Sequence, residues 1–375
     1  GAQYPWESAD DGTEQCPDWT IEPDGTCYRC YVAVYEHHVT AAVAYGIYNY
    51  VRITHDTEFL LHKGAEILIE TARFWKSRLQ YIKENDRYEI HRVTGPDEWH
   101  EPVDNNVYTN YLARWNLRYV TALTEMLSRE YPQEYTALVE KLGLTEEEIA
   151  DWDAVAAKVY LPRKEGTQLL EQFEGYFDLK EAVIEKYDSN DWPIRPEILN
   201  TTKKCETQII KQADVVMLLH LMGQEFDEET TKLNYSYYEK RTLHGSSLSP
   251  SIYSIMGLKV GDDSKAYRYL RRAALIDLVN LQGNTREGIH AANAGGVWQV
   301  VVFGFAGVSL DEEGMLCICP HMPPEWNGLT FRIHHLDSWL EITVHADNSV
   351  EVKVLEGGSV EIRIQGEKVT VRREI

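Results

Sequence analysis

The stretch TGPDEWHEPVDNNVYTNYLARWNL, residues 94–117, contains the change from loop to helix around which this sequence is organised. Gly95 and Pro96 interrupt a regular backbone at its start. The run Asp104-Asn105-Asn106 is typical of a helix N-cap, and apolar and aromatic residues follow at helical spacing, namely Tyr108, Tyr111, Leu112, Trp115 and Tyr119. We therefore predict a loop that ends at a cap, with Asp104 as the capping residue, and a long helix that runs to about Arg129.

The loop part of this stretch is rich in carboxylic acids, which stand beside Trp99 and His100. The acids are Asp97, Glu98, Glu101 and Asp104. A carboxylic acid that is held against an aromatic face stays protonated near neutral pH, because burial disfavours its charged form. The loop could therefore supply a proton donor. A solvated acidic loop that ends in a helix cap accounts for the same residues, and their spacing does not separate the two interpretations.

Composition limits the classes of function. A chain of 375 residues can form two domains, and its net charge of −23 argues against nucleic acid or an anionic membrane as a partner, though not against a small anion. No run of about 18 apolar residues predicts a membrane span. Six cysteines are too few for a disulfide framework, so Cys27 and Cys30, and Cys317 and Cys319, are predicted to be reduced thiols of a cytoplasmic protein. A four-thiolate zinc site is the less favoured alternative, and we predict no metal.

Apolar periodicity divides the chain into a helical part and a strand part. It predicts helices from about Glu36, over residues 58–81, from the capping box at Thr145 to Val159, and over 205–222, 230–242, 251–257, 265–280 and 296–305. Residues 1–30 and 162–200 have the composition of irregular loops. Near Leu310 the pattern changes to short alternating strands at 316–319, 329–333, 340–344, 350–354, 360–364 and 369–371. We predict a mainly α catalytic domain over 1–309 and a small antiparallel β-sandwich over 310–375.

The segment TLHGSSLSP, residues 242–250, is a candidate phosphate site. Ser249 and Pro250 are typical of a helix start, and His244, Gly245, Ser246 and Ser247 precede it. Hydroxyl groups and a flexible backbone at the positive end of a helix suit an anion. Simple N-capping by Ser249 is the alternative.

Two further segments carry polar residues that need an explanation. In NTREGIHAANAGGVW, residues 284–298, His290 lies in a predicted loop, and Gly295 and Gly296 directly precede an apolar helix, where glycines let the backbone approach an anion. Lys211 and Gln212 stand in an otherwise apolar predicted helix, so they must find partners or a cavity. A structural histidine and simple surface exposure are the respective alternatives.

Four motifs in a fixed order resemble glycoside hydrolase family 65, the group of maltose, kojibiose, nigerose and trehalose phosphorylases. They are TGPDEWHEPVDNNVYTNYLARWNL, KQADV, HGSSLSP and NTREGIHAANAGGVW. YPWESADDGTEQCP at residues 4–17 and ETARFW at residues 70–75 are similar to the family as well. The resemblance implies an (α/α)6 toroid followed by a small C-terminal β-sandwich, in agreement with the helix and strand pattern.

The resemblance also implies roles for the candidate residues. Glu98 matches the general acid, and Lys211 and Gln212 match residues that bind the glucosyl unit. Trp99 and His100 belong to the region around the acceptor sugar. The phosphate-binding residues are matched by Ser246, Ser247, His290 and the backbone N–H groups near Gly295 and Gly296.

The implied reaction is the inverting phosphorolysis of an α-glucosyl disaccharide, with inorganic phosphate as co-substrate and no cofactor. Phosphate is already an anionic nucleophile, so a phosphorylase does not need the second carboxylate of an inverting hydrolase. An inverting α-glucoside hydrolase on the same fold and a non-catalytic remnant that binds sugar are the alternatives. Which disaccharide is cleaved does not follow from the sequence.

Two departures from the family pattern affect these expectations. The upstream β-sandwich, linker and first toroid helices of family members have no counterpart here, which predicts a partial toroid that is completed by the missing N-terminal portion; the possible partners are that portion or a second copy in a homodimer. In EHHVTAAVAYG, residues 36–46, Ala42 stands where the family usually has Asp. That substitution weakens any role for this helix in the site.

Overall fold

The chain folds into two compact units, which are described separately. The computed structural model of residues 1–375 describes residues 1–21, 25, 27–189, 192–311 and 313–373. Unit 1 comprises Gly1–Val51, Asp56–Val183 and Glu197–Ile210, and unit 2 comprises Arg52–His55, Ile184–Pro196 and Lys211–Ile375. Residues 22–24, 26 and 190–191 of the two predicted loop stretches lie outside the described residues.

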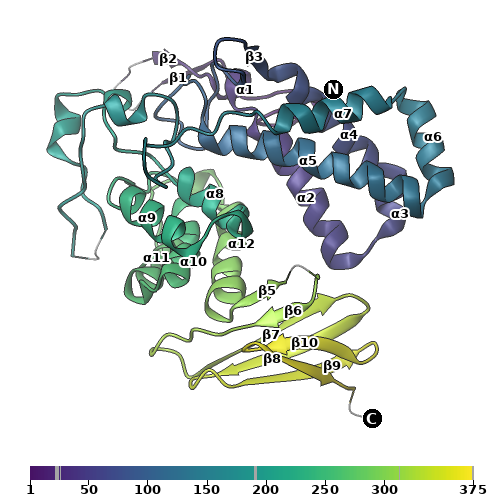
Figure 1. Cartoon of the computed structure of the whole chain (residues 1–375). Coiled ribbons are helices and arrows are strands. Elements are labelled where there is room, and N and C mark those ends of the chain that lie inside the picture. Colours follow the sequence, from purple (N-terminus) through teal and green to yellow (C-terminus); the bar gives the residue numbers. More distant parts are fainter. Residues whose placement is uncertain (22–24, 26, 190–191, 312, 374–375) are drawn as a thin grey trace. The chain divides into compact units, whose positions relative to one another are not determined.

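Unit 1 is built around the long helix α5 (Val107–Glu130), which contacts α4, α6 and α7 (Figure 1). The prediction of this helix is confirmed. The helices that accompany it in the chain are α1 (Val32–Tyr35), α2 (His38–Thr54), α3 (Thr57–Phe59), α4 (Ala65–Arg78), α6 (Pro132–Leu142) and α7 (Glu146–Ala156). Two short hairpins, β1 (Trp19–Ile21) with β2 (Cys27–Arg29) and β3 (Gln80–Ile82) with β4 (Arg87–Glu89), and 3-10 turns at Tyr176–Asp178, Glu197–Asn200 and Lys204–Glu206 complete the unit.

Two helix predictions in unit 1 need correction. The predicted helix over 58–81 contains a π-helical turn at Leu60–Gly64 and ends at Arg78, because Gln80 and Tyr81 pair with β4. Helix α6 was not predicted, although Pro132 at its start and Gly143 in the left-handed conformation at its end are common boundary residues.

The predicted capping box at Thr145 forms only in part. The Thr145 side chain accepts a hydrogen bond from Glu148 N, so the cap is confirmed. The Glu148 carboxylate does not need to reach back to Thr145, because it accepts two hydrogen bonds from Arg73 of α4 at 2.8 Å each. A bidentate guanidinium pair thus links α7 to α4.

Helix α10 (Ser249–Val260) is the central helix of unit 2, and almost every residue in it is buried. A helix that is apolar on all sides must be covered on all sides. Its neighbours are α8 (Val215–Leu221), α9 (Glu228–Glu239), α11 (Asp263–Leu275) and α12 (Ala291–Gln299), which continues as a π-helical segment, Val300–Phe305. Short 3-10 turns occur at Gly223–Glu225 and Thr285–Glu287.

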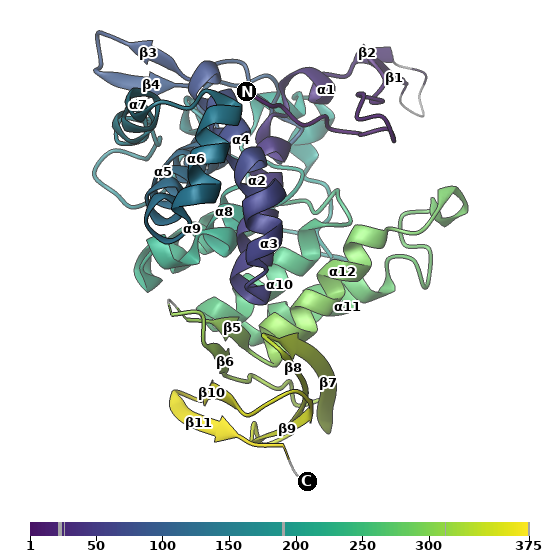
Figure 2. The same ribbon diagram turned by 90° about the vertical axis from the view of Figure 1, so that its right-hand side faces the viewer.

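The strands at the end of the chain form two sheets within unit 2 (Figure 2). The first contains β5 (Val308–Leu310), β6 (Leu316–Ile318), β10 (Val360–Ile364) and β11 (Glu367–Val371) in the order β11-β10-β6-β5. The second contains β7 (Gly328–His335), β8 (Ser338–His345) and β9 (Val350–Glu356). The expected all-antiparallel pairing is corrected at one place: β10 pairs with β6 in parallel, since the chain forms the second sheet before it returns to the first.

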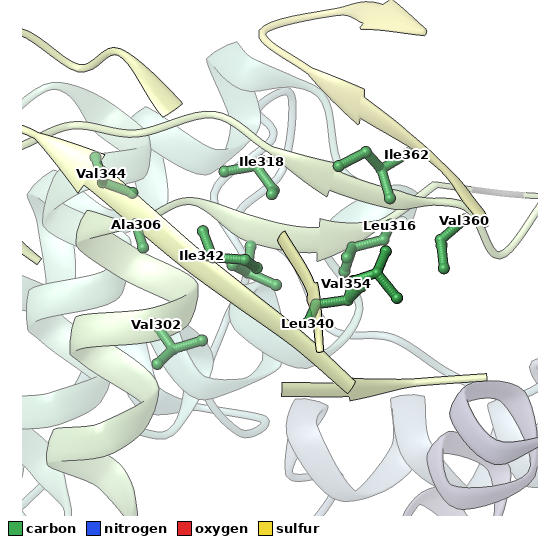
Figure 3. Packing of buried hydrophobic residues seen from close by; sticks show 11 residues of the cluster. Val302, Ala306, Leu316, Ile318, Leu340, Ile342, Val344, Val354, Val360 and Ile362 are labelled. Atoms are coloured by element: carbon green, nitrogen blue, oxygen red, sulfur yellow. The ribbon is translucent and has the colours of Figure 1, made fainter. Parts of the chain in front are cut away.

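The core of these sheets extends into the preceding helical segment. Leu340, Ile342 and Val344 of β8 are fully buried among residues of the other sheet, and Val302 and Ala306 pack into the same cluster (Figure 3). The division of the chain into domains at residues 309 and 310 remains a prediction, because this core lies on both sides of that boundary.

Two observations on the described part of the chain concern membrane-spanning helices and metal sites. Within it, no helix combines the length and the apolar character that crossing a bilayer requires. The same residues contain no group of three or more His, Cys, Asp or Glu side chains that could hold a metal ion. Cys30 lies near Cys16, at an Sγ–Sγ distance of 3.7 Å, and all six cysteines are free thiols.

Candidate active site

The segment that carries Glu98 is a closed loop in unit 1. Val93 N donates to Val103 O at 2.8 Å, and Val103 N donates to Val93 O at 2.9 Å. We call residues 94–102 the acid loop. Thr94 N donates to Tyr35 O at 3.0 Å, which ties the start of the loop to the end of α1. These backbone hydrogen bonds fix both ends of the acid loop.

Inside the acid loop, Asp97 and His100 form a buried pair. His100 Nδ1 lies 2.6 Å from Asp97 Oδ2, and the two side chains are 1% and 0% exposed. Gln172 Nε2 donates to the same carboxylate oxygen at 2.9 Å, and His100 Nε2 lies 2.8 Å from Thr207 O. The loop is therefore anchored to two segments that are distant in the sequence.

The two partners of His100 determine its protonation. A carbonyl oxygen only accepts, so Nε2 must donate its hydrogen to Thr207 O. The contact between Nδ1 and Asp97 Oδ2 must also contain a proton, because two facing lone pairs would repel at 2.6 Å. Either side chain could carry that proton; we assign it to His100, because an imidazole binds a proton more tightly than a carboxylate does, so that the pair is an imidazolium and a carboxylate.

A contact of His100 with substrate stays a prediction, and in this structure its side chain is engaged by the loop. The residue is 2% exposed, and both ring nitrogens are engaged by protein atoms. His100 supports the loop, together with Asp97, which was predicted as a loop support. The sequence shows a polar residue beside Glu98, but it does not show that the side chain is buried.

Glu98 and Trp99 occupy the positions between the two buried anchors. Both are partly exposed, unlike Asp97 and His100. Lys204 Nζ lies 4.7 Å from the centre of the Trp99 ring, a cation–π contact. The acid loop therefore fixes the residues on both sides of Glu98 and Trp99 and leaves these two side chains partly exposed. Their roles as general acid and as part of the acceptor region remain predictions.

The cap of α5 is Asn106, which corrects the prediction of Asp104. Asn106 Oδ1 accepts from Thr109 N and Thr109 Oγ1, both at 2.9 Å. Asp104 Oδ1 accepts from Arg92 N at 2.7 Å and is not available as the cap. The cap places the positive end of α5 directly after the acid loop.

Lys211 and Gln212 precede a helix rather than lie within one. Of the predicted helix over 205–222, only Val215–Leu221 is α-helical. Lys211 O accepts a hydrogen bond from Gly245 N at 2.8 Å, so that carbonyl serves a tertiary contact. The contact ties Lys211 to the phosphate-site candidate, and both residues belong to unit 2. Binding of a glucosyl unit by Lys211 and Gln212 remains a prediction.

The predicted phosphate-binding serines lie in a loop directly before α10. We call residues 242–248 the serine loop. Leu248 N donates to Ser246 Oγ at 3.3 Å, whereas the Ser247 hydroxyl has no hydrogen-bond partner within the described part of the chain. Helix α10 begins at Ser249 with Pro250 in its first turn, and Leu248 occupies the cap position without a side-chain hydrogen bond. The alternative of simple capping by Ser249 is therefore wrong.

His244 holds the base of the serine loop. Its backbone has a φ of 50°, and its buried ring contacts Ser249 Oγ through Nδ1 at 2.9 Å and Tyr269 Oη through Nε2 at 3.2 Å. Burial, helped by the cations Arg272 and Lys265, lowers the pKa of His244 to about 3. The ring is neutral at pH 7, so one nitrogen donates and the other accepts.

His290 stands at the N-cap position of α12. Its Nδ1 lies 2.6 Å from Asp277 Oδ1, and its backbone N donates to Asp277 Oδ2 at 2.8 Å. These hydrogen bonds from His290 lower the pKa of Asp277, whose carboxylate stays charged. The carboxylate orients the imidazole through Nδ1, and Nε2 lies 3.4 Å from Asn284 Nδ2. A contact of His290 with phosphate remains a prediction.

Gly295 and Gly296 lie inside α12, which corrects the prediction that they precede a helix. Their backbone N–H groups are past the first turn and belong to the helical ladder. A Cβ atom at Gly296 would lie 2.7 Å from Ser251 Oγ, whereas one at Gly295 would meet nothing within 4 Å. Gly296 thus allows α12 to approach the first turn of α10, which follows the serine loop. The backbone N–H groups of α12 that remain available to an anion lie at the start of the helix, beside His290.

The predicted site residues divide between the two units. Glu98, Trp99 and His100 belong to unit 1, and Lys211, Gln212, Ser246, Ser247, His290, Gly295 and Gly296 belong to unit 2. Within unit 2 the structure brings the Lys211 segment to the serine loop, and α12 to the first turn of α10. Gln172, Thr207 and Tyr269 were not predicted as parts of the site. Gln172 and Thr207 lie 75 and 107 positions from their partners, so no local motif could have identified them.

Comparison with known families matches almost the whole chain. Residues 1–299 match the glycosyl hydrolase family 65 central catalytic domain, and residues 311–371 match the family's C-terminal domain. The two matched regions include every candidate site residue described above.

Among curated proteins, the kojibiose phosphorylase of Thermoanaerobacter brockii is 52% identical over 372 residues, which cover 99% of this chain and 48% of that protein. The alpha,alpha-trehalose phosphorylase of the same organism is 35% identical and covers 100% of this chain and 46% of that protein. The maltose phosphorylase of Bacillus subtilis is 31% identical over 90% of this chain and 43% of that protein. The chain spans about half the length of the curated relatives it matches.

A solved structure supports the same assignment of the fold. It is a protein from the human microbiome assigned as a kojibiose phosphorylase, and it matches with a TM-score of 0.85 and 28% identity over 100% of this chain and 47% of that one. The predicted fold class, mainly helical with a C-terminal β-sandwich as in the (α/α)6 enzymes of this group, is confirmed.

Proposed function

Because the chain belongs to glycosyl hydrolase family 65, we propose that it carries the catalytic residues of an inverting disaccharide phosphorylase. The proposed substrate is kojibiose, the disaccharide named for the relatives that are 52% identical. The products would be β-glucose 1-phosphate and glucose. Inorganic phosphate is the co-substrate, and the reaction needs no cofactor.

In the proposed reaction Glu98 acts as the general acid. It protonates the glycosidic oxygen while phosphate attacks the anomeric carbon from the opposite face, so that the configuration inverts in one displacement. The buried Asp97–His100 pair supports this role, because it fixes the residues on both sides of Glu98 and Trp99. A catalytic acid whose loop is rigid loses less entropy as it reaches the reactive position.

The observation that carries the proposal is the free donor capacity of the serine loop. The Ser247 hydroxyl has no partner within the described residues, and the loop precedes the positive end of the twelve-residue helix α10. The carboxylates near this region are already engaged, Glu239 by Tyr269 and Lys265, and Asp277 by His290. Donors without acceptors favour a bound anion, whereas a hydrolase needs a carboxylate base at that position.

A phosphate-dependence assay tests this proposal. Kojibiose, trehalose, maltose and nigerose are each incubated with the purified protein, with and without phosphate, and glucose and glucose 1-phosphate are quantified. We expect glucose release from kojibiose only when phosphate is present, with the β anomer of glucose 1-phosphate detected by proton NMR. Glucose release at the same rate without phosphate would identify a hydrolase and refute the proposal. Turnover of another disaccharide in preference to kojibiose would refute the substrate assignment alone.

We also propose that the reaction takes place in the cytoplasm. The six free cysteines support a reducing compartment. Fractionation of the source cells with an antibody against this chain tests the location, and recovery outside the cytoplasmic fraction would exclude it.

A further inference from the structure

Unit 2 contains a cavity of about 580 Å³ beside helix α11, apart from the residues assigned to the proposed reaction. One wall is a face of α11. The other walls come from Tyr187, Ser189 and Trp192, from Glu239 of α9, and from the chain that follows α11. Neither Lys211 and Gln212 nor the serines of the serine loop line it. Its size falls in the range of small-molecule sites and far exceeds what an inorganic anion fills.

The cavity is strongly basic, although the chain carries a net charge of −23. Four cations line it, all from α11: Lys265, Arg268, Arg271 and Arg272. The only carboxylate among its lining residues is Glu239, so the lining has a formal charge of +3 (four cations minus one anion). Like charges three and four positions apart on a helix repel each other, and a bound anion would relieve that repulsion.

Two of these cations make no ion pair with a carboxylate in the described part of the chain. Lys265 Nζ lies 2.8 Å from Glu239 Oε2, which neutralises that pair. The guanidinium groups of Arg271 and Arg272 make no hydrogen bond or ion pair with any residue that the structure describes. Arg272 instead lies 4.1 Å from the centre of the Trp192 ring, which holds its side chain in place at the cavity. Burial lowers the pKa of Arg272, and the negative charge of Asp188 opposes that shift without a hydrogen bond, so a phosphate group could complete the interactions of this half-buried guanidinium.

The remaining lining suits a polyol rather than a purely apolar body. Hydroxyl groups come from Tyr187, Ser189 and Tyr269. An apolar part is formed by Leu275 at the end of α11 and by Val279 and Leu281 after it. Sugars combine hydroxyl groups with apolar ring faces, so the charge, the size and the hydroxyl lining together match a phosphorylated sugar.

We propose that this basic cavity is a binding site for a sugar phosphate, with the phosphate on Arg271 and Arg272 and the sugar hydroxyls on Tyr187 and Ser189. The binding itself does not depend on the proposed phosphorylase activity.

A chain of hydrogen bonds connects the cavity with the serine loop. Tyr269 donates to Glu239 Oε1 at 2.9 Å, so its oxygen can accept from His244 Nε2 at 3.2 Å. His244 Nδ1 then accepts from the Ser249 hydroxyl at 2.9 Å. A ligand that draws Lys265 or Glu239 toward itself would change the partners of Tyr269 and, through His244, the base of the serine loop. This coupling rests on the proposed function, because it is measured as a change in affinity for phosphate.

Calorimetric titration with glucose 6-phosphate tests the binding, because this probe is not a product of the proposed reaction. We expect one molecule to bind per chain, with glucose alone giving no heat and inorganic phosphate binding about tenfold more weakly or less. Binding should weaken about tenfold or more in R271Q/R272Q, because two charge-assisted contacts are lost. Arg286 is an exposed arginine of the same unit outside the cavity, so R286Q should bind like the parent protein.

Several outcomes would overturn the assignment. Unchanged binding in R271Q/R272Q would place the ligand elsewhere, and loss of binding in S246A/S247A would place it at the serine loop. Inorganic phosphate that binds as tightly as glucose 6-phosphate would exclude a sugar phosphate as the ligand class. If the double variant does not fold by circular dichroism, R271Q alone decides, because Arg271 is exposed and its loss leaves the Arg272–Trp192 contact intact. Absence of phosphorolysis with retained binding would refute the proposed function but leave this site standing.

Discussion

The acid loop and the serine loop differ in how their polar groups are held. In the acid loop the polar side chains beside Glu98 are bound to each other and to the protein interior, through the pair Asp97–His100. In the serine loop His244 holds the base and Leu248 N donates to Ser246 Oγ, whereas the Ser247 hydroxyl is left without a partner in the described part of the chain. One loop is rigid around its functional residue, and the other keeps its hydrogen-bonding capacity unused.

The two histidines show the same difference in charge. His100 lies between a carboxyl group and a carbonyl, and we assign it two hydrogens. His244 is buried near Arg272 and Lys265, which together with its desolvation lower its pKa to about 3, so it is neutral. A group that must transfer a proton needs a fixed position, whereas a group that must bind an anion needs free donors. The predictions below test that contrast.

The largest effect is expected for Glu98→Gln. Loss of the general acid should reduce kcat for kojibiose phosphorolysis by about 10²- to 10⁴-fold, because the departing sugar then leaves as an alkoxide. With α-glucosyl fluoride as donor the leaving group needs no proton, and the loss should shrink to about tenfold or less. Initial rates of phosphorolysis with both donors provide the measurement.

Glu101→Gln is the matched control, because Glu101 lies in the same loop and accepts from Thr94 Oγ1 at 3.3 Å. It should change kcat much less than Glu98→Gln. Equal losses with both donors in Glu98→Gln would mean that Glu98 does not protonate the leaving group. Full activity of Glu98→Gln would remove the residue from the mechanism.

The next effect tests the buried Asp97–His100 pair of the acid loop. Asp97→Asn removes the charge that His100 needs, and breaking a buried ion pair from one side costs about 3 kcal/mol or more. We expect a loss of that size in the free energy of unfolding from urea denaturation, together with a lower kcat. Asp153→Asn, on an exposed position of α7, should leave both unchanged. A stability of Asp97→Asn equal to that of Asp153→Asn would contradict the imidazolium–carboxylate pair.

Ser247 and Ser249 test whether the serine loop keeps a hydroxyl group for binding an anion. Ser247→Ala should raise KM for phosphate by about ten- to a hundredfold, the effect of one hydrogen bond to a charged group, and should leave the melting temperature unchanged. Ser249→Ala should do the reverse, because it removes the partner of His244 and costs about 1 kcal/mol of stability. If both variants change KM and stability alike, the serine loop has no division between a binding part and a structural part.

Local patterns predicted the elements of this fold well, because apolar periodicity reports burial directly. The helix after residue 106 and the strands after residue 310 follow from it. The choice of Asn106 over Asp104 as the cap does not, because all the residues of that run can cap. Tertiary hydrogen bonds determine which residue caps the helix. Arg92 N donates to the Asp104 side chain, and the Asn105 side chain donates to Glu174.

The errors in the site have the same origin. Buried Ile209 and Ile210 resemble the start of a helix, but Lys211 O is bound to Gly245 N of a distant loop. Gly295 and Gly296 resemble a helix boundary, but they lie in α12, where the close approach of Ser251 leaves no room for a Cβ atom at Gly296. The motifs identified which residues to consider, and the long-range contacts determined what each does.

A smaller effect concerns the charge states of the two histidines. By ¹⁵N NMR of histidine-labelled protein, the His244 ring should remain neutral at pH 5, whereas the His100 ring should be cationic at pH 7. His244 binds no proton in the folded state until the pH approaches 3, but the unfolded chain binds one below about 6.5. Stability should therefore fall as the pH decreases from 6.5, by about 1.4 kcal/mol per pH unit for this residue. A cationic His244 at pH 5 would remove the proposed contrast.

The smallest effect distinguishes two adjacent glycines of α12. Gly296→Ala places a Cβ atom 2.7 Å from Ser251 Oγ, so Ser251 must rotate away from Leu248 O, at a cost of about 1 kcal/mol. Gly295→Ala meets open space and should stabilise the helix by about 0.5–1 kcal/mol, because alanine loses less backbone entropy than glycine. Thermal melts of the two variants give the sign, and phosphate KM gives the function. If Gly295→Ala raises KM without a loss of stability, the open space at Gly295 belongs to the anion site. The anion site would then include α12 as well as the serine loop.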